Sequence, residues 1–401
     1  MAQIVPDQTL PSPSRASVGG NTYTIEGGTE AGRNLFHSFE RFSVPTGAEA
    51  FFNNAATVEN ILTRVTGGQI SNIDGLIRAN GTANLFLLNP NGIVFGENAR
   101  LDVGGSFFAS TAHRLDFRDG SVFSASEPNT SSLLTVSVPV GIQLGSAPGA
   151  IELRGTGNVD RFPTETPGLS VPPGQAIALV GGNITLDGAI VSAPSGRVEM
   201  GSVIDGRVGF DENWTLDYDG VSEWGDVQLL NRSSVFVPTS DLDNAPNTGI
   251  QVVGGDLSIE GSQIATLTQN GRASGNIDIQ ASERLSLGGA LDTFPFSASV
   301  ETQTDATGNG GSLAVTAPEI AINDGARLQT WSFGDGNAGD VTVNAEAVRL
   351  PPVGSLSISS RLSKKAPTAA LVARTSERET AETSASRLTT SSSTTADKSE
   401  R

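Results

Sequence analysis

The strongest constraint on the fold is a unit in which a glycine precedes a short run of alternating apolar and polar residues. In G-D-V-T-V-N-A, which begins at Gly339, Val341 and Val343 alternate with polar side chains. Such period-two alternation indicates a strand with one buried face. Related units recur after about residue 175, and they begin at Gly181, Ser195, Gly225, Gly254, Gly275 and Gly310.

A single strand cannot bury its apolar face alone, but successive strands can do so when they stack as the coils of a solenoid. A second short strand often follows the first, as in residues 319–322 before the turn at 323–325. We therefore expect an all-β chain that forms a right-handed parallel β-helix. A β-sandwich is the structural alternative, and we favour it less because the repeat is one glycine-led strand and not a pair of hairpins.

Composition agrees with many short strands and tight turns. The 401 residues include 47 Gly, while charged residues make up 17% and aromatic residues 5%. No apolar run reaches the roughly 18 residues that a membrane-spanning helix needs. The net charge of −18, without a basic stripe in the first 350 residues, argues against a nucleic-acid partner. The absence of cysteine excludes disulfides and thiolate chemistry.

The segment N-L-F-L-L-N-P-N-G-I-V-F-G, residues 84–96, contains two apolar runs interrupted by a turn. Pro90 fixes φ near −65°, and Asn91 and Gly92 tolerate positive φ. These properties predict a hairpin whose arms are the two apolar runs, and we expect it to lie outside the rungs. Asn89 and Asn91 are expected to bond to neighbouring backbone groups and hold the turn.

Residues 21–145 resemble the N-terminal secretion domain of filamentous haemagglutinin-like exoproteins of two-partner secretion, with most similarity to the cyanobacterial type. The family's second turn motif, N-P-N-L, is absent, and F-N-N-A-A-T-V-E-N stands in its neighbourhood. The segments that carry the resemblance are N-L-F-H-S-F-E-R-F from Asn34, V-E-N-I-L-T-R-V-T-G-G from Val58, A-N-L-F-L-L-N-P-N-G-I-V-F-G from Ala83 and L-D-V-G-G-S-F-F-A-S-T-A from Leu101.

This resemblance implies a β-helix with an N-terminal cap and extra-helical hairpins. It implies Sec-dependent export, recognition by the periplasmic POTRA domains of an outer-membrane pore, and folding outside the cell. The partner-binding secretion motif would be N-P-N-G-I, which comprises Asn89, Pro90, Asn91, Gly92 and Ile93. The product would be secreted or held at the cell surface, where it would serve adhesion or aggregation, with host or neighbouring-cell glycans as candidate partners.

We divide the chain into four parts. Residues 1–20 are a post-signal segment without a signal peptide of its own, and residues 21–145 are the secretion domain. Residues 146–354 continue the glycine-rich repeats. Residues 355–401 contain no Gly, Asn, Gln or aromatic residue. This tail is expected to be a disordered Ser/Thr-rich segment or a stretch that is out of frame.

Catalysis has little support in the sequence, although β-helical enzymes that degrade polysaccharides are the main alternative class. The two histidines, His37 and His113, lack a nearby Ser/Asp arrangement for a triad. Two histidines without cysteine also make a zinc site a poor interpretation. We therefore expect no catalytic residue, no cofactor and no bound metal in this chain. A carrier for a downstream toxin domain is a further alternative.

One cluster of acidic and aromatic residues, within residues 210–226, stands out. Carboxylates are hard ligands for Ca²⁺, and aromatic faces pack on sugars, so a carbohydrate or calcium site is one interpretation. The interpretation that we favour is a solvated loop whose aromatic side chains pack on the rod. The candidate residues are Asp211, Trp214, Asp217, Asp219 and Trp224.

Overall fold

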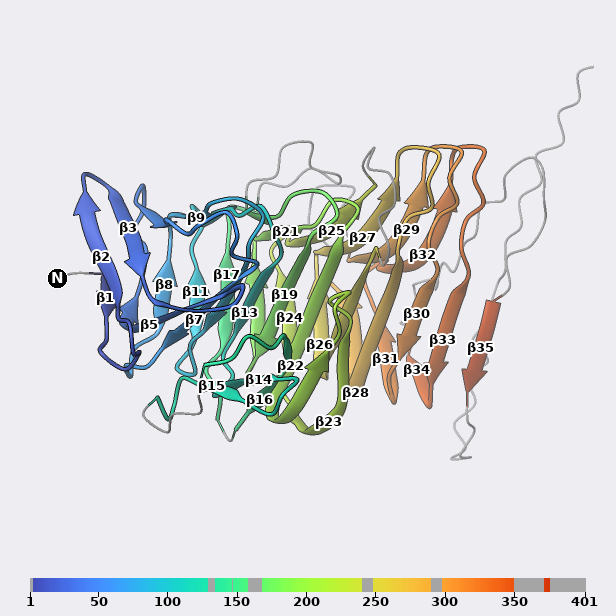
Figure 1. Cartoon of the computed structure of the whole chain (residues 1–401). Helices are drawn as coiled ribbons and strands as arrows, with labels where there is room; N and C mark the ends of the chain where they lie inside the picture. The colour runs from blue at the N-terminus through green and yellow to red at the C-terminus, as the bar shows by residue number, and fades with distance from the viewer. Residues whose placement is uncertain are drawn as a thin grey trace, which may run out of the picture.

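The computed structural model describes residues 3–128, 134–145, 147–157, 168–239, 248–289, 298–349 and the strand Leu371–Thr375. In these residues the regular structure consists of β-strands, which stack in rungs along a rod (Figure 1). No helix in the described part is long and apolar enough to cross a membrane. Apart from the strand at 371–375, the tail at 355–401 lies outside the described residues.

The first face of the rod is a parallel sheet that takes one strand from each rung. Neighbouring strands pair in register, so that Leu85 lies opposite both Ile61 and Phe107. The strands of this face are β5 (Asn34–Phe42), β7 (Asn60–Val65), β10 (Asn84–Leu88), β13 (Phe107–Ser110), β19 (Ala176–Gly181), β22 (Arg197–Phe210), β26 (Gly249–Glu260), β28 (Asn276–Gly288), β30 (Leu313–Thr316), β33 (Val341–Ala345) and β35 (Leu371–Thr375).

Two further faces close each rung. The second face contains β8 (Ser71–Ile73), β11 (Ile93–Phe95), β17 (Ile151–Arg154), β20 (Ile184–Asp187), β24 (Val227–Leu230), the distal halves of β26 and β28, β31 (Glu319–Ile322) and β34 (Ala347–Arg349). The third face contains β3 (Thr22–Gly27), β6 (Glu49–Phe52), β9 (Leu76–Ala79) and β12 (Arg100–Asp102), followed by β18 (Leu169–Ser170), β21 (Ile190–Ser192), β25 (Ser234–Pro238), β27 (Gln263–Thr268), β29 (Ser299–Thr304) and β32 (Arg327–Ser332). The expected parallel β-helix is therefore confirmed.

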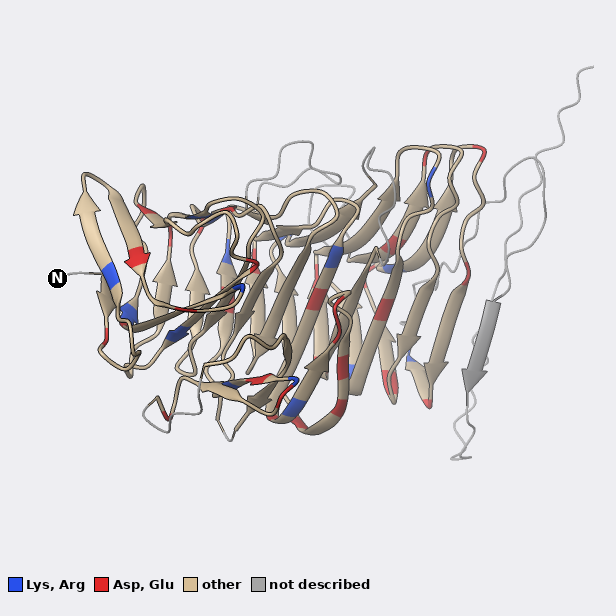
Figure 2. Cartoon of the chain, in the orientation of Figure 1, with Lys and Arg blue, Asp and Glu red and all other residues tan. Residues whose placement is uncertain are grey.

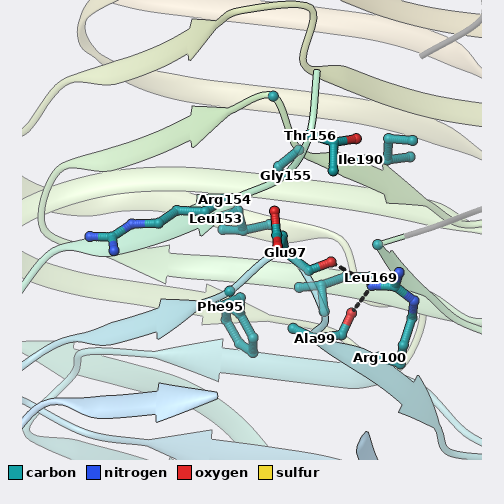
Figure 3. A pocket seen from close by; sticks show the side chains of 14 residues that line it. Phe95, Glu97, Ala99, Arg100, Leu153, Arg154, Gly155, Thr156, Leu169 and Ile190 are labelled. Carbon is teal, nitrogen blue, oxygen red and sulfur yellow. Dashed lines mark hydrogen bonds between the residues drawn. The ribbon is translucent and has the colours of Figure 1, made fainter. Parts of the chain in front are cut away.

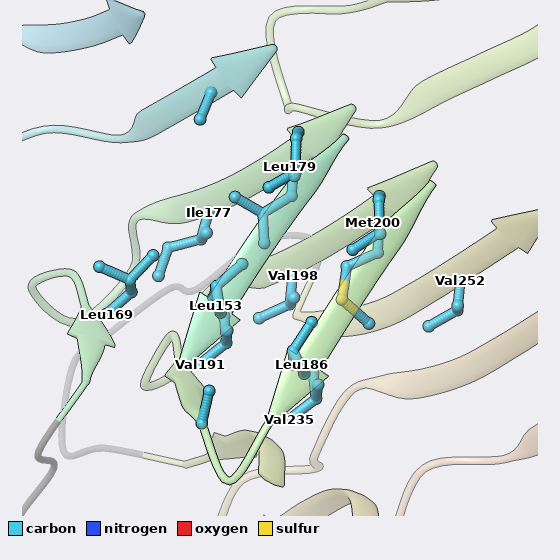
Figure 4. Packing of buried hydrophobic residues seen from close by; sticks show 14 of the residues in the cluster. Leu153, Leu169, Ile177, Leu179, Leu186, Val191, Val198, Met200, Val235 and Val252 are labelled. Carbon is cyan, nitrogen blue, oxygen red and sulfur yellow. The ribbon is translucent and has the colours of Figure 1, made fainter. Parts of the chain in front are cut away.

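Inward-pointing side chains of the three faces form one continuous core (Figure 4). On the first face, Leu85, Phe107, Ile177 and Val198 occupy successive rungs at matching register, and each is at most 1% exposed. Burying a side chain of this kind stabilises the fold by about 1.5–3 kcal/mol. The alternating pattern in the sequence thus corresponds to columns of apolar residues along the rod.

The glycines that precede the strands in the last three units have a steric cause. A Cβ placed on Gly339 would lie 2.1 Å from the carbonyl oxygen of Gly311, and one on Gly311 would lie 2.0 Å from that of Gly275. Gly275 is equally close to the carbonyl oxygen of Thr248, at 2.1 Å. Because successive rungs approach so closely at this corner, no side chain fits there.

Antiparallel strands cap the N-terminal end of the rod, as the resemblance implies. Strands β1 (Ile4–Pro6) and β4 (Thr29–Ala31) pair antiparallel with β5. Strand β2 (Ser14–Gly19) pairs antiparallel with β3. These pairings cover the edges of the first rung, which would otherwise expose unpaired backbone groups.

An extra-helical antiparallel sheet covers the outer surface of the first face. It contains β14 (Arg114–Phe117), β15 (Val122–Ser124), β16 (Pro139–Leu144), the second half of β22, and β23 (Leu216–Trp224). Between this sheet and the rod lies a second apolar core, which includes Phe36, Phe86 and Phe108. Strands on both sides of residue 145 therefore belong to one packed unit.

A buried arginine joins the N-terminal segment, the rod and the extra-helical sheet. The guanidinium of Arg64, a residue that is 4% exposed, donates to the hydroxyls of Ser38 and Thr9, both at 2.9 Å. It also donates to the carbonyl oxygen of Ser124 at 2.6 Å and lies 4.4 Å from the centre of the Phe123 ring. Burial lowers the Arg64 pKa to about 10, so the group remains charged at neutral pH.

Candidate functional site

The segment from Asn84 to Gly96 forms a corner of the rod and not a hairpin. Strand β10 pairs in parallel with β7 and β13, and β11 pairs in parallel with β8 and β17. The predicted hairpin outside the rungs is therefore wrong. Both apolar runs are already paired along both edges by the neighbouring rungs, so they cannot pair with each other, and neither offers a free edge.

The corner itself is a hydrogen-bonded turn. The Gly92 amide donates to the Asn89 carbonyl oxygen at 3.1 Å, which closes a four-residue turn around Pro90 and Asn91. Gly92 has φ +124°, as expected for glycine at such a position, whereas Asn91 is not in the positive-φ region. A Cβ on Gly92 would also lie 3.2 Å from the carbonyl oxygen of Ala150 in the next rung.

The Asn89 side chain is fully buried, and its amide group is completely used. Its nitrogen donates to the Gln69 carbonyl oxygen and to the Ser71 hydroxyl, both at 2.9 Å. Its oxygen accepts from the Asn91 backbone amide at 3.1 Å and from the Asn91 side chain at 3.0 Å. The expectation that Asn89 and Asn91 hold the turn is confirmed.

The motif is unevenly exposed in the folded chain. Asn91 is exposed, and its side chain donates to the Gly67 carbonyl oxygen at 2.7 Å. Pro90 is half-buried, and its carbonyl oxygen accepts from the Gly149 amide at 2.8 Å. Asn89, Gly92 and Ile93 are buried. The folded surface therefore presents only the Pro90–Asn91 part of the motif.

The acidic and aromatic cluster lies on the extra-helical hairpin of β22 and β23. The Asp211 carboxylate accepts from the backbone amides of Asn213 at 2.9 Å and Thr215 at 3.0 Å, so it caps its own turn. Trp214 stacks on Phe86 of the rod, with ring centres 5.4 Å apart. The structure thus brings Asp211 and Trp214 to one turn, beside the rod.

The other cluster members lie further along β23. The Asp217 carboxylate accepts from the Asp219 backbone amide at 2.9 Å, and both residues are exposed. Trp224 packs on Tyr218 with ring centres 5.8 Å apart. Among the described residues, no three His, Asp or Glu side chains are grouped so that they could hold a metal ion. Figure 2 shows acidic and basic positions scattered along the described part of the rod, without a basic stripe.

Both histidines occupy structural positions. His37 is 1% exposed, its Nδ1 lies 3.0 Å from the Ser14 hydroxyl, and its ring stacks on Phe39. Burial lowers its pKa to about 3, so this imidazole is neutral at physiological pH. The His113 backbone amide donates to the Gln143 carbonyl oxygen at 2.9 Å, which fixes the entry to β14.

The described surface has a small hollow beside Phe95 and a larger one beside Trp214. The smaller, of about 60 Å³, lies beside Phe95 and Leu169, where Arg100 donates to the carbonyl oxygens of Glu97 and Ala99 (Figure 3). It is far below the ~300 Å³ of a typical ligand pocket. The larger, of about 530 Å³, lies beside Trp214 between the extra-helical sheet and the starts of β7 and β10.

Sequence reasoning missed a ladder of three asparagines, of which Asn60 and Asn84 line this larger groove. Asn34, Asn60 and Asn84 stand at the same register position in β5, β7 and β10, and each donates to or accepts from the next at 3.0 Å. Their signal was present in the sequence, because each precedes two apolar residues at the start of a strand, in N-L-F, N-I-L and N-L-F.

Comparison with known proteins finds a family whose sequence model matches this chain. The model of the TPS secretion domain matches residues 2–247, which is more than half of the chain and a longer stretch than residues 21–145. The heme/hemopexin-binding protein of Haemophilus influenzae is 34% identical over 88 residues, which are 22% of this chain and 9% of that protein. The matched segment is thus less than a tenth of that relative.

Two solved structures match most of this chain at low sequence identity. The HMW1 secretion domain from Haemophilus influenzae is 16% identical with a TM-score of 0.49, and the match covers 89% of this chain and 84% of that one. The filamentous hemagglutinin secretion domain is 15% identical with a TM-score of 0.43, with 87% and 96% covered.

Proposed function

Because the chain belongs to the family of TPS, or two-partner secretion, domains, we propose that its immediate role is to be recognised and exported by a cognate outer-membrane transporter. Members of this family are exoproteins that cross the outer membrane. The observation that carries the proposal is the family match over residues 2–247. The N-P-N-G-I segment lies within this range, at a corner of the rod.

The burial of the motif supports recognition by the transporter before the chain folds. In the folded chain Asn89, Gly92 and Ile93 are inaccessible, and Asn89 has no free hydrogen-bonding group. The proposed reader is the set of periplasmic POTRA domains of the transporter, and it would meet the motif while the chain is still extended. After passage the same residues would close the corner between β10 and β11.

The wider role that we propose is adhesion or aggregation at the cell surface, without catalysis in this chain. A stiff rod with a continuous apolar core is suited to hold binding surfaces away from a cell. The two histidines serve the fold, and Asp211 is committed to its own turn. These positions support a binding role over the alternative of a polysaccharide-degrading enzyme.

The test is an export assay. A signal peptide is placed ahead of Ala2, and the chain is produced with and without a candidate partner transporter. The chain is then quantified in the medium and in the periplasm, for wild type and for Asn89→Ala with Asn91→Ala. The proposal predicts transporter-dependent export that the double substitution abolishes. Export that is indifferent to both transporter and substitution would overturn it.

A further inference from the structure

The larger groove, beside Trp214, has the dimensions and lining of a ligand site. Its volume of about 530 Å³ falls within the ~300–1,000 Å³ typical of small-molecule pockets. Its lining combines aromatic side chains with amides, carboxylates and one guanidinium, among them those of Trp214, Asn60, Asn84, Glu212 and Arg118. No residue of the N-P-N-G-I corner lines this groove.

Trp214 provides a fixed aromatic surface at this groove. Its indole stacks on Phe86 and lies nearly parallel to the Phe210 ring, at an interplanar angle of 4°. Trp214 also has φ +60°, a backbone region that is unfavourable for a bulky residue. A glycine or asparagine would fit this turn position with less strain. The turn therefore holds a rigid, partly exposed aromatic ring at the edge of the hollow.

The asparagine ladder supplies hydrogen-bond donors along the opposite wall. Asn34 uses both amide hydrogens on the carbonyl oxygens of Thr135 and Ser137. Asn60 and Asn84 each use one, on the preceding asparagine of the ladder. The second amide hydrogen of these two residues has no acceptor among the described residues, and both side chains are half-buried in the groove wall. Each can donate to a ligand hydroxyl.

The charges of the groove select against anions. Three carboxylates line it, those of Glu59, Asp211 and Glu212; Glu59 is ion-paired with Arg33, so Asp211 and Glu212 stand against the single guanidinium of Arg118. Glu212 is exposed at the tip of the turn and can accept hydrogen bonds from hydroxyl groups. An acidic sugar or an acidic peptide would be repelled, whereas a neutral polyol would satisfy donors and acceptors alike.

We propose that this groove binds an uncharged pyranose glycan, with a sugar ring packed on Trp214 and its hydroxyls bonded to Asn60, Asn84 and Glu212. Pyranose rings have an apolar C–H face and an equatorial rim of hydroxyls, so an aromatic platform with amides and carboxylates at its edge matches both. The lining is continuous between the rod and the extra-helical sheet, so folding of both is needed to form the site.

The experiment titrates the purified full chain with neutral gluco-, galacto- and manno-oligosaccharides and, for comparison, with oligogalacturonate. Binding is followed by saturation-transfer NMR and by tryptophan fluorescence. We expect saturable binding of at least one neutral series and none of the acidic one. Trp214→Ala should weaken binding at least tenfold. Trp224→Phe, which changes an aromatic outside the groove, should leave the dissociation constant within twofold of wild type.

A second variant distinguishes loss of the stacking surface from misfolding of the chain. Trp214→Phe keeps an aromatic ring against Phe86 but offers a smaller stacking surface, so we expect an unchanged far-UV circular dichroism spectrum and a several-fold weaker affinity. Absence of saturable binding to every neutral series would overturn the proposal. Preference for the acidic oligosaccharide, or equal affinity in wild type and a folded Trp214→Phe chain, would overturn it too. Neither result would bear on the export assay.

Discussion

Replacing Asn89 by alanine should destabilise the folded chain by about 2–6 kcal/mol. Its amide nitrogen makes two bonds, to the Gln69 carbonyl and the Ser71 hydroxyl, at 2.9 Å each. Each bond contributes about 0.5–1.5 kcal/mol net. Ser71 is 0% exposed, so its hydroxyl would be left without a partner, at a further cost of about 1–3 kcal/mol. The two bonds to Asn91 count little, because Asn91 is exposed and water can replace them.

Urea unfolding of the purified full chain, followed by far-UV circular dichroism, measures this effect. The matched control is Asn91→Ala, which removes an exposed amide and should cost about 0.5–1 kcal/mol. Adding Ser71→Ala to Asn89→Ala removes the stranded hydroxyl, so the double variant should regain about 1 kcal/mol. The reasoning fails if Asn89→Ala unfolds within 0.5 kcal/mol of wild type with an unchanged slope, or if Asn91→Ala costs more.

Three further predictions concern other parts of the fold. Gly92→Val should cost at least about 1 kcal/mol, because valine would be forced to φ near +124° and towards the Ala150 carbonyl; a wild-type melting temperature would contradict this. Arg64→Met should destabilise the fold by about 3–5 kcal/mol, because it leaves buried polar groups without a partner. It should also raise amide hydrogen exchange in β1; unchanged exchange would show that Arg64 does not hold the N-terminal segment to the rod. Desolvation raises the pKa of the fully buried Glu199 to about 8, because it is a larger effect than that of the neighbouring Arg197 guanidinium, which lowers the Glu199 pKa; the folded form therefore holds a proton that the unfolded chain releases near pH 4.5, and stability should fall as pH rises between those values. Unfolding free energies at pH 5 and pH 9 should therefore differ less in Glu199→Gln than in wild type; equal differences would show that Glu199 does not titrate in this way.

The strand positions were predictable because they depend on local alternation. The unit at Gly339 becomes β33, and the unit at Gly310 becomes β30. The reason for the glycines was not predictable in the same way. Gly275, Gly311 and Gly339 are required by the carbonyl oxygen of the adjacent rung, a contact between residues some thirty positions apart, as in Gly311 and Gly339.

The incorrect prediction of a hairpin from Asn84 to Gly96 has a related cause. The turn chemistry of Asn-Pro-Asn-Gly suits a hairpin and a β-helix corner equally, so local residues cannot distinguish them. Pairing of β10 with β7 and β13 decides the outcome, and that pairing follows from the register of the whole solenoid. The groove beside Trp214 could not be assembled from the sequence either, because its walls come from residues as distant as Glu59 and Trp214.

The central claim is that the N-P-N-G-I motif is read during export, and not merely that it stabilises the fold. The decisive measurement compares transporter-dependent accumulation in the medium for two destabilised chains. One is Asn89→Ala with Asn91→Ala; the other is Ile320→Ala, a fully buried position of β31 outside residues 2–247, which should cost a comparable ~2–5 kcal/mol. The account predicts that only the motif variant fails to leave the periplasm. Equal export of the two chains, or equal loss in both, would contradict it.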